Sequence, residues 1–209
     1  MPGDTTYTPV QRPEDSNNHF AALSAIVATA LSRVSGSTLV QVKSVKGEGL
    51  NPVGFVDVQI MVHQQDGNGV TYPHGVIHNI PYIRLQGGSR AFICDPQPGD
   101  IGVMLVCERD ISGVKKNRSA SGPGSFRQND YADGIYIGGP LNAAPTEYCG
   151  WIDGDFHVKT TGAFIVDAES MEVNCGIKAT GDVVAGSISL DSHTHGGVKA
   201  GTDTTGGPE

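Results

Sequence analysis

The residues with the clearest capacity for chemistry are two histidines near the end of the sequence, His193 and His195. Side chains alternate between the two faces of an extended strand, so histidines separated by one residue lie on the same face, about 7 Å apart. One pair supplies two imidazoles, too few to complete a typical metal site. Three copies around a common axis would supply six. The pair is therefore either two chance histidines in a disordered end or one third of a metal site shared by a trimer.

Six imidazoles arranged as two stacked triangles form an octahedral site. Zinc prefers four ligands in a tetrahedron, so six nitrogens suit iron, nickel or cobalt better. Such a site has no open position for a substrate, and its role would be to tie three chain ends together. The other five histidines follow no ligand spacing, and we expect them on the surface or in the core: His19, His63, His74, His78 and His157.

The composition favours an all-β, turn-rich protein. Of 209 residues 29 are glycine, 38% are hydrophobic and 17% are charged. The net charge of −8 disfavours a nucleic-acid partner, because phosphate binding needs clustered Lys and Arg. The sequence has no secretion signal, no apolar run of the roughly 18 residues that a membrane span needs, and no Cys-x-x-Cys pair. We expect its four cysteines to be free thiols, buried as small hydrophobes: Cys94, Cys107, Cys149 and Cys175.

The first 35 residues are predicted to form an arm and one short helix. Residues 1–15 are rich in Pro, Thr and Asp and suit an extended arm. Ser16 or Asn17 is a suitable N-cap for a helix that runs to about Arg33. Such a helix needs a surface to pack against, either the chain's own β-domain or a partner. Its apolar residues recur at helical spacing and form one stripe: Phe20, Leu23, Ile26, Val27, Ala30, Leu31 and Val34.

Residues 36–142 have the pattern of β-strands separated by glycine-rich turns. About five such strands fit a small closed barrel, of which the OB-fold is the most economical form. The longest apolar run, 101–107, is expected to be a strand buried on both faces. Residues 113–127 are polar and rich in Gly and Ser, so we expect an exposed loop, with the basic run 115–118 in solvent. The expected strands are 39–46, 55–62, 76–80, 91–94 and 101–107.

Residues 143–190 contain short strand-like units eight to ten residues apart, at 156–162, 164–168, 171–176 and within 177–190. Repeats of this kind stack rather than fold alone. This segment has too little apolar surface for its own core, and exposed strand edges invite aggregation. Winding three chains together gives them one core and pairs every edge. We therefore predict an intertwined, trimeric triple-stranded β-helix over 143–190 and a metal-bound apex over 191–209; the alternative is a flexible tail.

Three stretches make the chain resemble the membrane-piercing central spike proteins of contractile-tailed bacteriophage baseplates, of the simple P2-like and Mu-like kind. They are residues 94–102 with Arg109 and Asp110, the segment 133–139, and residues 192–197 leading to 205–208. The resemblance covers nearly all residues after about 36. The order of barrel, needle, His-x-His and Gly-Gly-Pro end is more specific than any single motif.

The resemblance implies a homotrimer whose OB-fold domains sit on the baseplate hub protein and whose needle pierces the host outer membrane during tail contraction. It also implies one iron ion per trimer, held by six nitrogens from His193 and His195 of three chains. Iron is preferred over nickel or cobalt on the resemblance alone. The implied location is the tail baseplate tip of the virion, after assembly in the host cytoplasm.

Other classes fit the sequence less well, and we predict that the chain is not an enzyme and has no catalytic residues. A metal-dependent β-barrel enzyme needs a cluster of ligands. His74 and His78 lie four apart, but Gly75 and the pair Ile80-Pro81 oppose a helix that would align them. A nucleic-acid-binding OB-fold needs a basic groove with stacking aromatics, and only 115–118 is basic. Within the structural class, the spike of a phage-derived bacteriocin or another contractile injection system fits the same sequence.

Overall fold

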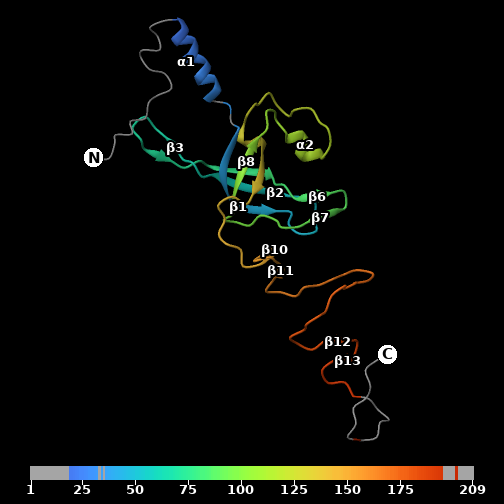
Figure 1. The fold of residues 1–209 in the computed structure, drawn as a ribbon. Coiled ribbons are helices and arrows are strands. Elements are labelled where there is room, and N and C mark those ends of the chain that lie inside the picture. Colours follow the sequence, from blue (N-terminus) through green and yellow to red (C-terminus); the bar gives the residue numbers. More distant parts are fainter. Residues whose placement is uncertain (1–18, 33, 35, 195–200, 202–209) are drawn as a thin grey trace, which may run out of the picture. The chain divides into compact units, whose positions relative to one another are not determined.

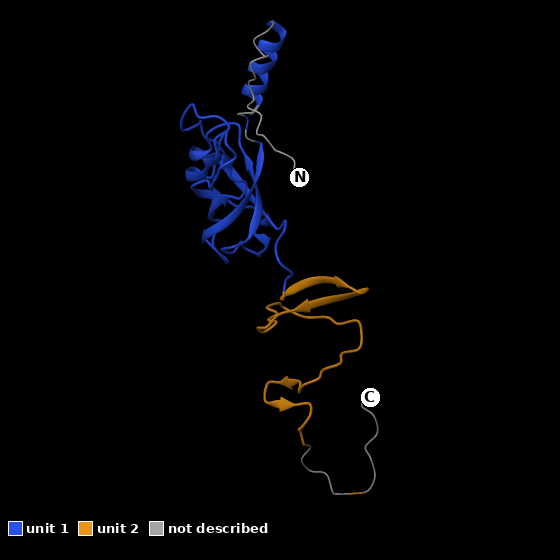
Figure 2. Cartoon of the chain, turned by 90° about the vertical axis from the view of Figure 1, so that its left-hand side faces the viewer, with its two compact units in different colours: residues 1–145 blue, residues 146–209 orange. Residues whose placement is uncertain are grey.

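The computed structural model describes residues 19–32, 34, 36–194 and 201, and the chain divides into two compact units, 1–145 and 146–209 (Figure 2). Most regular elements are β-strands, as the composition predicts. Among the described residues, no helix is long and apolar enough to cross a membrane. The predicted boundaries near 35, 142 and 190 stay predictions, because the division into units does not test them.

The predicted N-terminal helix is confirmed as α1, His19–Ser32 (Figure 1). Its sequence is rich in Ala and Leu, the strongest helix formers, and holds no glycine or proline. The proposed caps Ser16 and Asn17, the arm 1–15 and Arg33 lie outside the described residues. The apolar stripe is exposed in the single chain: Phe20 is 81% exposed and Leu31 66%. These exposures disfavour α1 as a cover for its own β-domain.

Five strands of the first unit form a curled half-barrel: β1 (Ser37–Lys46), β2 (Phe55–Ile60), β5 (Val76–Pro81), β8 (Ile101–Val106) and β9 (Gly134–Gly138). They lie in the order β5-β2-β1-β8-β9, with every neighbouring pair antiparallel (Figure 1). The two edge strands approach each other at one end. There Tyr82 and Tyr136 form a parallel bridge, and the Ile83 N–H donates to the Tyr136 carbonyl at 3.0 Å.

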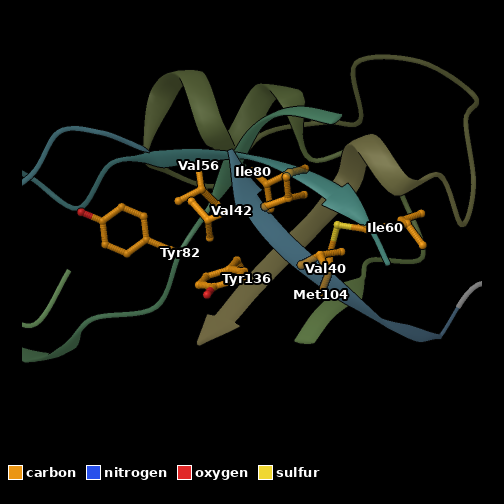
Figure 3. Close-up of a cluster of buried hydrophobic side chains, with 9 residues drawn as sticks. Val40, Val42, Val56, Ile60, Ile80, Tyr82, Met104 and Tyr136 are labelled. Carbon is orange, nitrogen blue, oxygen red and sulfur yellow. The ribbon is translucent and has the colours of Figure 1, made fainter. Parts of the chain in front are cut away.

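The hydrophobic core lies on the inner face of this half-barrel (Figure 3). In β2 every second residue is buried, the period-two pattern of a strand with one apolar face. The β1–β2 connection approaches β1 closely, because a Cβ on Gly54 would lie 1.7 Å from the Lys46 carbonyl oxygen, so only glycine fits there. The buried cluster comprises Val40, Val42, Val56, Val58, Ile60, Ile80, Tyr82, Met104 and Tyr136.

The prediction that the apolar run 101–107 is buried on both faces is wrong for the single chain. In β8, Gly102 and Met104 are buried, Ile101 and Val103 are half-buried, and Leu105 is exposed. The physical reason is the curl of the sheet, which places the core against one face only. The other expected strands are confirmed, although the run 91–94 contributes only to the short hairpin of β6 (Leu85–Gly87) and β7 (Arg90–Phe92). A second short hairpin pairs β3 (Gln64–Gln65) with β4 (Thr71–Tyr72).

Most of the segment 113–127 is exposed, as its composition predicts, but it is not a plain loop. It begins with helix α2, Ser112–Asn117, which carries part of the basic run. The Lys115 ammonium donates to the Asn79 and Ala132 carbonyls at 3.2 and 3.0 Å, and the Arg118 guanidinium donates to the Val53 carbonyl at 2.9 Å. These two cations therefore bind backbone carbonyls of neighbouring segments, although Arg118 is exposed and Lys115 only half-buried.

The rest of this segment is fixed by a buried ion cluster. Asp133, in the short 3-10 helix η2 (Tyr131–Asp133), is fully buried and accepts two hydrogen bonds from the Arg127 guanidinium, at 2.7 and 2.9 Å. Asp110 is also buried and accepts from the Ser125 hydroxyl at 2.6 Å. Hydrogen bonds from the Ser112 and Ser125 hydroxyls, with Arg127 beside them, hold the pKa of Asp110 well below its usual range. The ionised cluster anchors the segment.

The described part of the second unit has no core of its own. It contains the hairpins β10 (Tyr148–Ile152) with β11 (Asp155–Lys159) and β12 (Val184–Ala185) with β13 (Ile188–Ser189). No residue of 146–194 is buried, and residues 160–183 contain no strand. The strand expected at 156–162 is confirmed in β11, whereas those expected at 164–168 and 171–176 are not formed in the single chain.

The prediction of buried cysteines is wrong for three of the four. All four are free thiols, but Cys94, Cys149 and Cys175 are exposed and Cys107 is half-buried. Two of the exposed thiols, Cys149 and Cys175, lie in the second unit, where no residue of 146–194 is buried in the single chain.

Candidate functional site: the C-terminal tip

The last described stretch of the chain approaches the predicted metal site through a small hairpin. Val184 pairs with Ser189 and Ala185 with Ile188, leaving Gly186 and Ser187 as the turn. Gly186 has φ +64°, a left-handed conformation that glycine adopts without strain and that tight hairpin turns require. The Leu190 N–H donates to the Val183 carbonyl at 2.9 Å and extends the pairing by one step. The hairpin therefore reverses the chain just before the two histidines.

A cluster of short polar side chains fixes the turn that follows. The Ser192 N–H donates to the Ser189 hydroxyl at 3.0 Å, and the two hydroxyls lie 2.9 Å apart. The Asp191 N–H donates to the Asp182 carboxylate at 3.1 Å. Hydrogen bonds from the Ser189 hydroxyl and the Asp191 N–H lower the pKa of Asp182, so this carboxylate is ionised at neutral pH. Both strands of the hairpin thus contribute to one turn over residues 189–192.

His193 is held by its backbone and by its ring. Its N–H donates to the Ser189 carbonyl at 3.1 Å, and its ring Nδ1 lies 3.0 Å from the same oxygen and 3.3 Å from the Leu190 carbonyl oxygen. A carbonyl oxygen only accepts hydrogen bonds, so these contacts favour the tautomer with the proton on Nδ1 and the lone pair on Nε2. A metal-bound histidine commonly donates its second ring nitrogen to a backbone carbonyl in this way. The orientation of His193 therefore fits a ligand that binds through Nε2.

His195, the second predicted ligand, lies outside the described residues. Among the residues that are described, no group of three or more His, Cys, Asp or Glu side chains could hold a metal ion. The described part of one chain therefore brings a single predicted ligand, His193, to the tip. The predicted site needs further donors from His195 and from other chains.

Sequence reasoning missed the residues that position His193. Ser189 and Asp182 were not singled out, although short polar side chains commonly bond to nearby backbone groups in turns. The spacing of Ser189 and Ser192 just before the histidine pair is the signal that would have found this turn. It does not identify Asp182, which reaches the turn only because β12 and β13 pair.

The first unit contains one further buried ionic cluster. The Arg84 guanidinium donates to the Asp95 carboxylate at 2.6 Å, and the Tyr82 hydroxyl donates to the same oxygen at 3.0 Å. Burial opposes ionisation of Asp95, but the hydrogen bonds from Arg84, the Gly49 N–H and Tyr82 together outweigh it and lower the pKa of Asp95. Asp95 also accepts from the Gly49 N–H at 2.7 Å, and Arg84 donates to the Asn51 carbonyl at 2.9 Å. These hydrogen bonds hold the β1–β2 connection in place, so the role of the cluster is structural.

A comparison with known protein families finds a match at the C-terminal end of the chain. The family model described as the GpV Apex motif matches residues 187–209. The match begins in the turn of the β12–β13 hairpin and includes His193 and His195. No curated protein matches the chain.

Proposed function

Because the chain carries the GpV apex motif of phage baseplate spike proteins at its C-terminal end, we propose that it forms a homotrimeric needle that punctures the host outer membrane during tail contraction. The motif indicates the function of a baseplate central spike. That function is structural rather than enzymatic. It implies a place at the tail tip of the virion and partners in the baseplate.

The observation that carries the trimeric needle is the second unit's lack of an interior. Its large apolar side chains are exposed in one chain; Trp151, for example, is 78% exposed. Exposed apolar side chains in such number favour an interface with a partner. Three chains wound as a triple-stranded β-helix over 143–190 would cover these side chains and pair the edges of residues 160–183. The same arrangement explains why one chain alone forms only two short hairpins there.

The first unit suits the attachment end of such a spike. The strand order β5-β2-β1-β8-β9, with a parallel bridge between the edge strands, supports an OB-fold over residues 36–142. Its packed core and its two buried ionic clusters make it the rigid part of the chain. We propose that this domain sits on the baseplate hub protein, with no nucleic-acid partner, and that the spike assembles in the host cytoplasm before it enters the virion.

The apex over 191–209 is proposed to hold one iron ion per trimer, through six nitrogens from His193 and His195 of three chains. The ion, when bound, supplies a closed octahedral link between three chain ends. The residues of this chain prepare it: the Ser189 carbonyl fixes the ring of His193, and the Asp182 carboxylate and Ser192 fix the turn before it. A tip fastened in this way resists fraying when the baseplate drives it against the membrane.

Metal analysis of the purified full chain tests this function. We expect one iron per three chains, because each chain supplies two of six nitrogens. The double variant His193→Ala/His195→Ala should stay trimeric and lose the iron. His157→Ala is the matched control, since it removes an exposed histidine of β11 in the same unit, and it should retain the iron. A wild-type tip without metal, or one metal ion per single chain, would contradict the proposal.

A further inference from the structure

The N-terminal helix carries a second signature of self-association, which the apex does not explain. Its apolar residues follow the alternating three- and four-residue spacing of a heptad repeat, with Phe20 and Val27 at one seam position and Leu23 and Ala30 at the other. Val34 continues this spacing in the sequence just after the helix ends. Helices with this spacing pack against like helices, because the seam stays on one side over successive turns. The repeat therefore points to other helices, rather than to a sheet, as the surface that covers α1.

The seam has wider apolar flanks than a two-helix coiled coil needs. Valine at one seam position with leucine at the other suits two helices. In α1, however, Ile26 and Leu31 occupy the flanking positions that usually carry charged residues. Both are more than 60% exposed in the single chain. A stripe of this width fits a helix that contacts two neighbours at once, as in a three-helix bundle.

The polarity and length of α1 also require a partner. Its 14 residues include no Asp, Glu, Lys or Arg, so the helix has neither a charged outer face nor salt bridges along it. A helix that is apolar on most sides is stable in water only when it is buried. An isolated helix of 14 residues is marginal by itself, because the cost of nucleation is not recovered. Burial against equivalent helices supplies the missing stabilisation.

The connection to the barrel brings these helices together in the proposed spike. The Val34 N–H donates to the Leu31 carbonyl at 3.1 Å, and the Gly36 carbonyl accepts from the Val106 N–H of β8 at 3.0 Å. The helix therefore ends within a few residues of a fixed point on the barrel. In a threefold assembly the three fixed points are related by the needle axis, which raises the local concentration of the helices and makes them parallel.

We infer that α1 packs against α1 of two further copies of the chain as a parallel three-helix bundle in the N-terminal part of the chain. This inference rests on the proposed trimer, since the bundle needs three chains on one axis. The bundle would be a second contact between the three chains, an apolar one, in addition to the proposed metal site. The partner is a copy of the chain rather than a baseplate protein, because a heptad seam without charged flanks is complementary to itself.

Hydrogen exchange of the purified full-length chain, with its native mass measured in parallel, tests the bundle. We expect the amides of residues 23–32 to exchange on the order of 100-fold more slowly than in an unstructured peptide. Val27→Asp places a carboxylate on the seam and should abolish this protection. Ala28→Asp is the matched control: it puts the same residue one position along, on the side of the helix away from the seam, and protection should persist.

The possible outcomes separate the bundle from the trimer itself. A trimeric mass with helix amides that exchange as fast as an unstructured peptide would overturn the bundle and leave the spike intact. Equal loss of protection in Val27→Asp and Ala28→Asp would also overturn it, because the seam would then have no special role. A monomeric mass would overturn both the bundle and the proposed trimeric needle. A trimeric mass with protection lost only in Val27→Asp supports the bundle.

Discussion

The two units of this chain differ in where they put their apolar side chains. In the first unit, alternate residues of five strands enclose a core in which Val58, Ile80 and Met104 have no exposed surface. In the second unit, residues of the same types, such as Val166, Ile165 and Met171, are exposed. An apolar pattern therefore predicts burial, but it does not say whether the same chain or a neighbouring copy covers the side chains.

The difference follows from how each unit pairs its strands. In the first unit β1 lies between β2 and β8, and strands far apart in sequence close the half-barrel. In the second unit each hairpin pairs only with itself, and a two-stranded hairpin is marginally stable in water. The second unit therefore has the strand-forming residues of a sheet without the neighbours that complete one. In the proposed trimer, other copies of the chain would supply those neighbours.

The largest expected effect concerns two adjacent residues of the second unit, Phe164 and Ile165, which are 70% and 75% exposed in the single chain. Neighbouring residues of an extended strand face opposite sides, so one of the two points into the proposed shared core. Phe164→Ala or Ile165→Ala, whichever faces inward, should destabilise the assembly by about 4 kcal/mol per chain. Denaturant unfolding at two protein concentrations measures this loss. Equal and negligible effects of both substitutions would contradict a shared core.

The corresponding change in the first unit is Met104→Ala. Met104 is fully buried in the core of one chain, and truncation of a buried methionine leaves a cavity. We expect the free energy of unfolding of the barrel to fall by about 3 kcal/mol. Because this core belongs to one chain, the loss should be independent of protein concentration, unlike that in the second unit. Met61→Ala, at an exposed position just after β2, is the control and should change stability little.

The two units should respond to a fall in pH over different pH ranges. Histidine ligands bind metal only when they are deprotonated, so the proposed tip should lose iron as the pH falls below about 5. In the barrel, burial opposes ionisation of Asp57, but hydrogen bonds from the Asn79 N–H, the His78 ring and the Ser44 hydroxyl outweigh it and lower its pKa from 3.8 to about 2.

The lowered pKa of Asp57 determines how the stability of the barrel changes with pH. The ionised Asp57 contributes about 2 kcal/mol of stability at pH values above 4, and this contribution is lost as the pH falls from 4 towards 2. Iron release followed against pH, together with unfolding of the barrel, measures both steps. Asp57→Asn should flatten the pH dependence of barrel stability below pH 4 and leave iron release unchanged. If iron release and the loss of barrel stability occurred at the same pH, the two units would not be independent.

The smallest expected effect is at the turn before the tip. Ser192→Ala removes the hydroxyl contact with Ser189 but keeps the backbone hydrogen bond from residue 192. Barrel stability should stay within about 0.5 kcal/mol of wild type, because the change is at an exposed position in the other unit. Iron should be lost to a chelator faster than from wild type but more slowly than from the double histidine variant. Iron loss as complete as in that variant would show that the turn itself forms the site.

Much of the first unit could be predicted from the sequence, because its information is local. The alternation of Phe55–Ile60 gives a strand with one buried face, and the spacing of Phe20, Leu23 and Val27 gives a helix. What could not be predicted depends on distant contacts. Asp133 and Arg127 bind each other only after the barrel folds, and Lys115 finds carbonyls from two other segments.

The candidate site was predictable in part for the same reason. The His193 and His195 pair is visible in the sequence, and the apex motif at 187–209 supports the interpretation of the tip. The orientation of the His193 ring could not be predicted, because it depends on the Ser189 carbonyl that the hairpin turn presents. The strands expected at 164–168 and 171–176 are not formed in the single chain, and in the proposed trimer neighbouring chains would supply their partners.

Sedimentation equilibrium of the purified full-length chain tests the central claim, that the second unit obtains its core from three copies, most directly. One chain has a mass of 21.8 kDa. We expect a species of about 65 kDa, the mass of three chains, that persists on dilution. A species of 21.8 kDa over the same concentrations would contradict it.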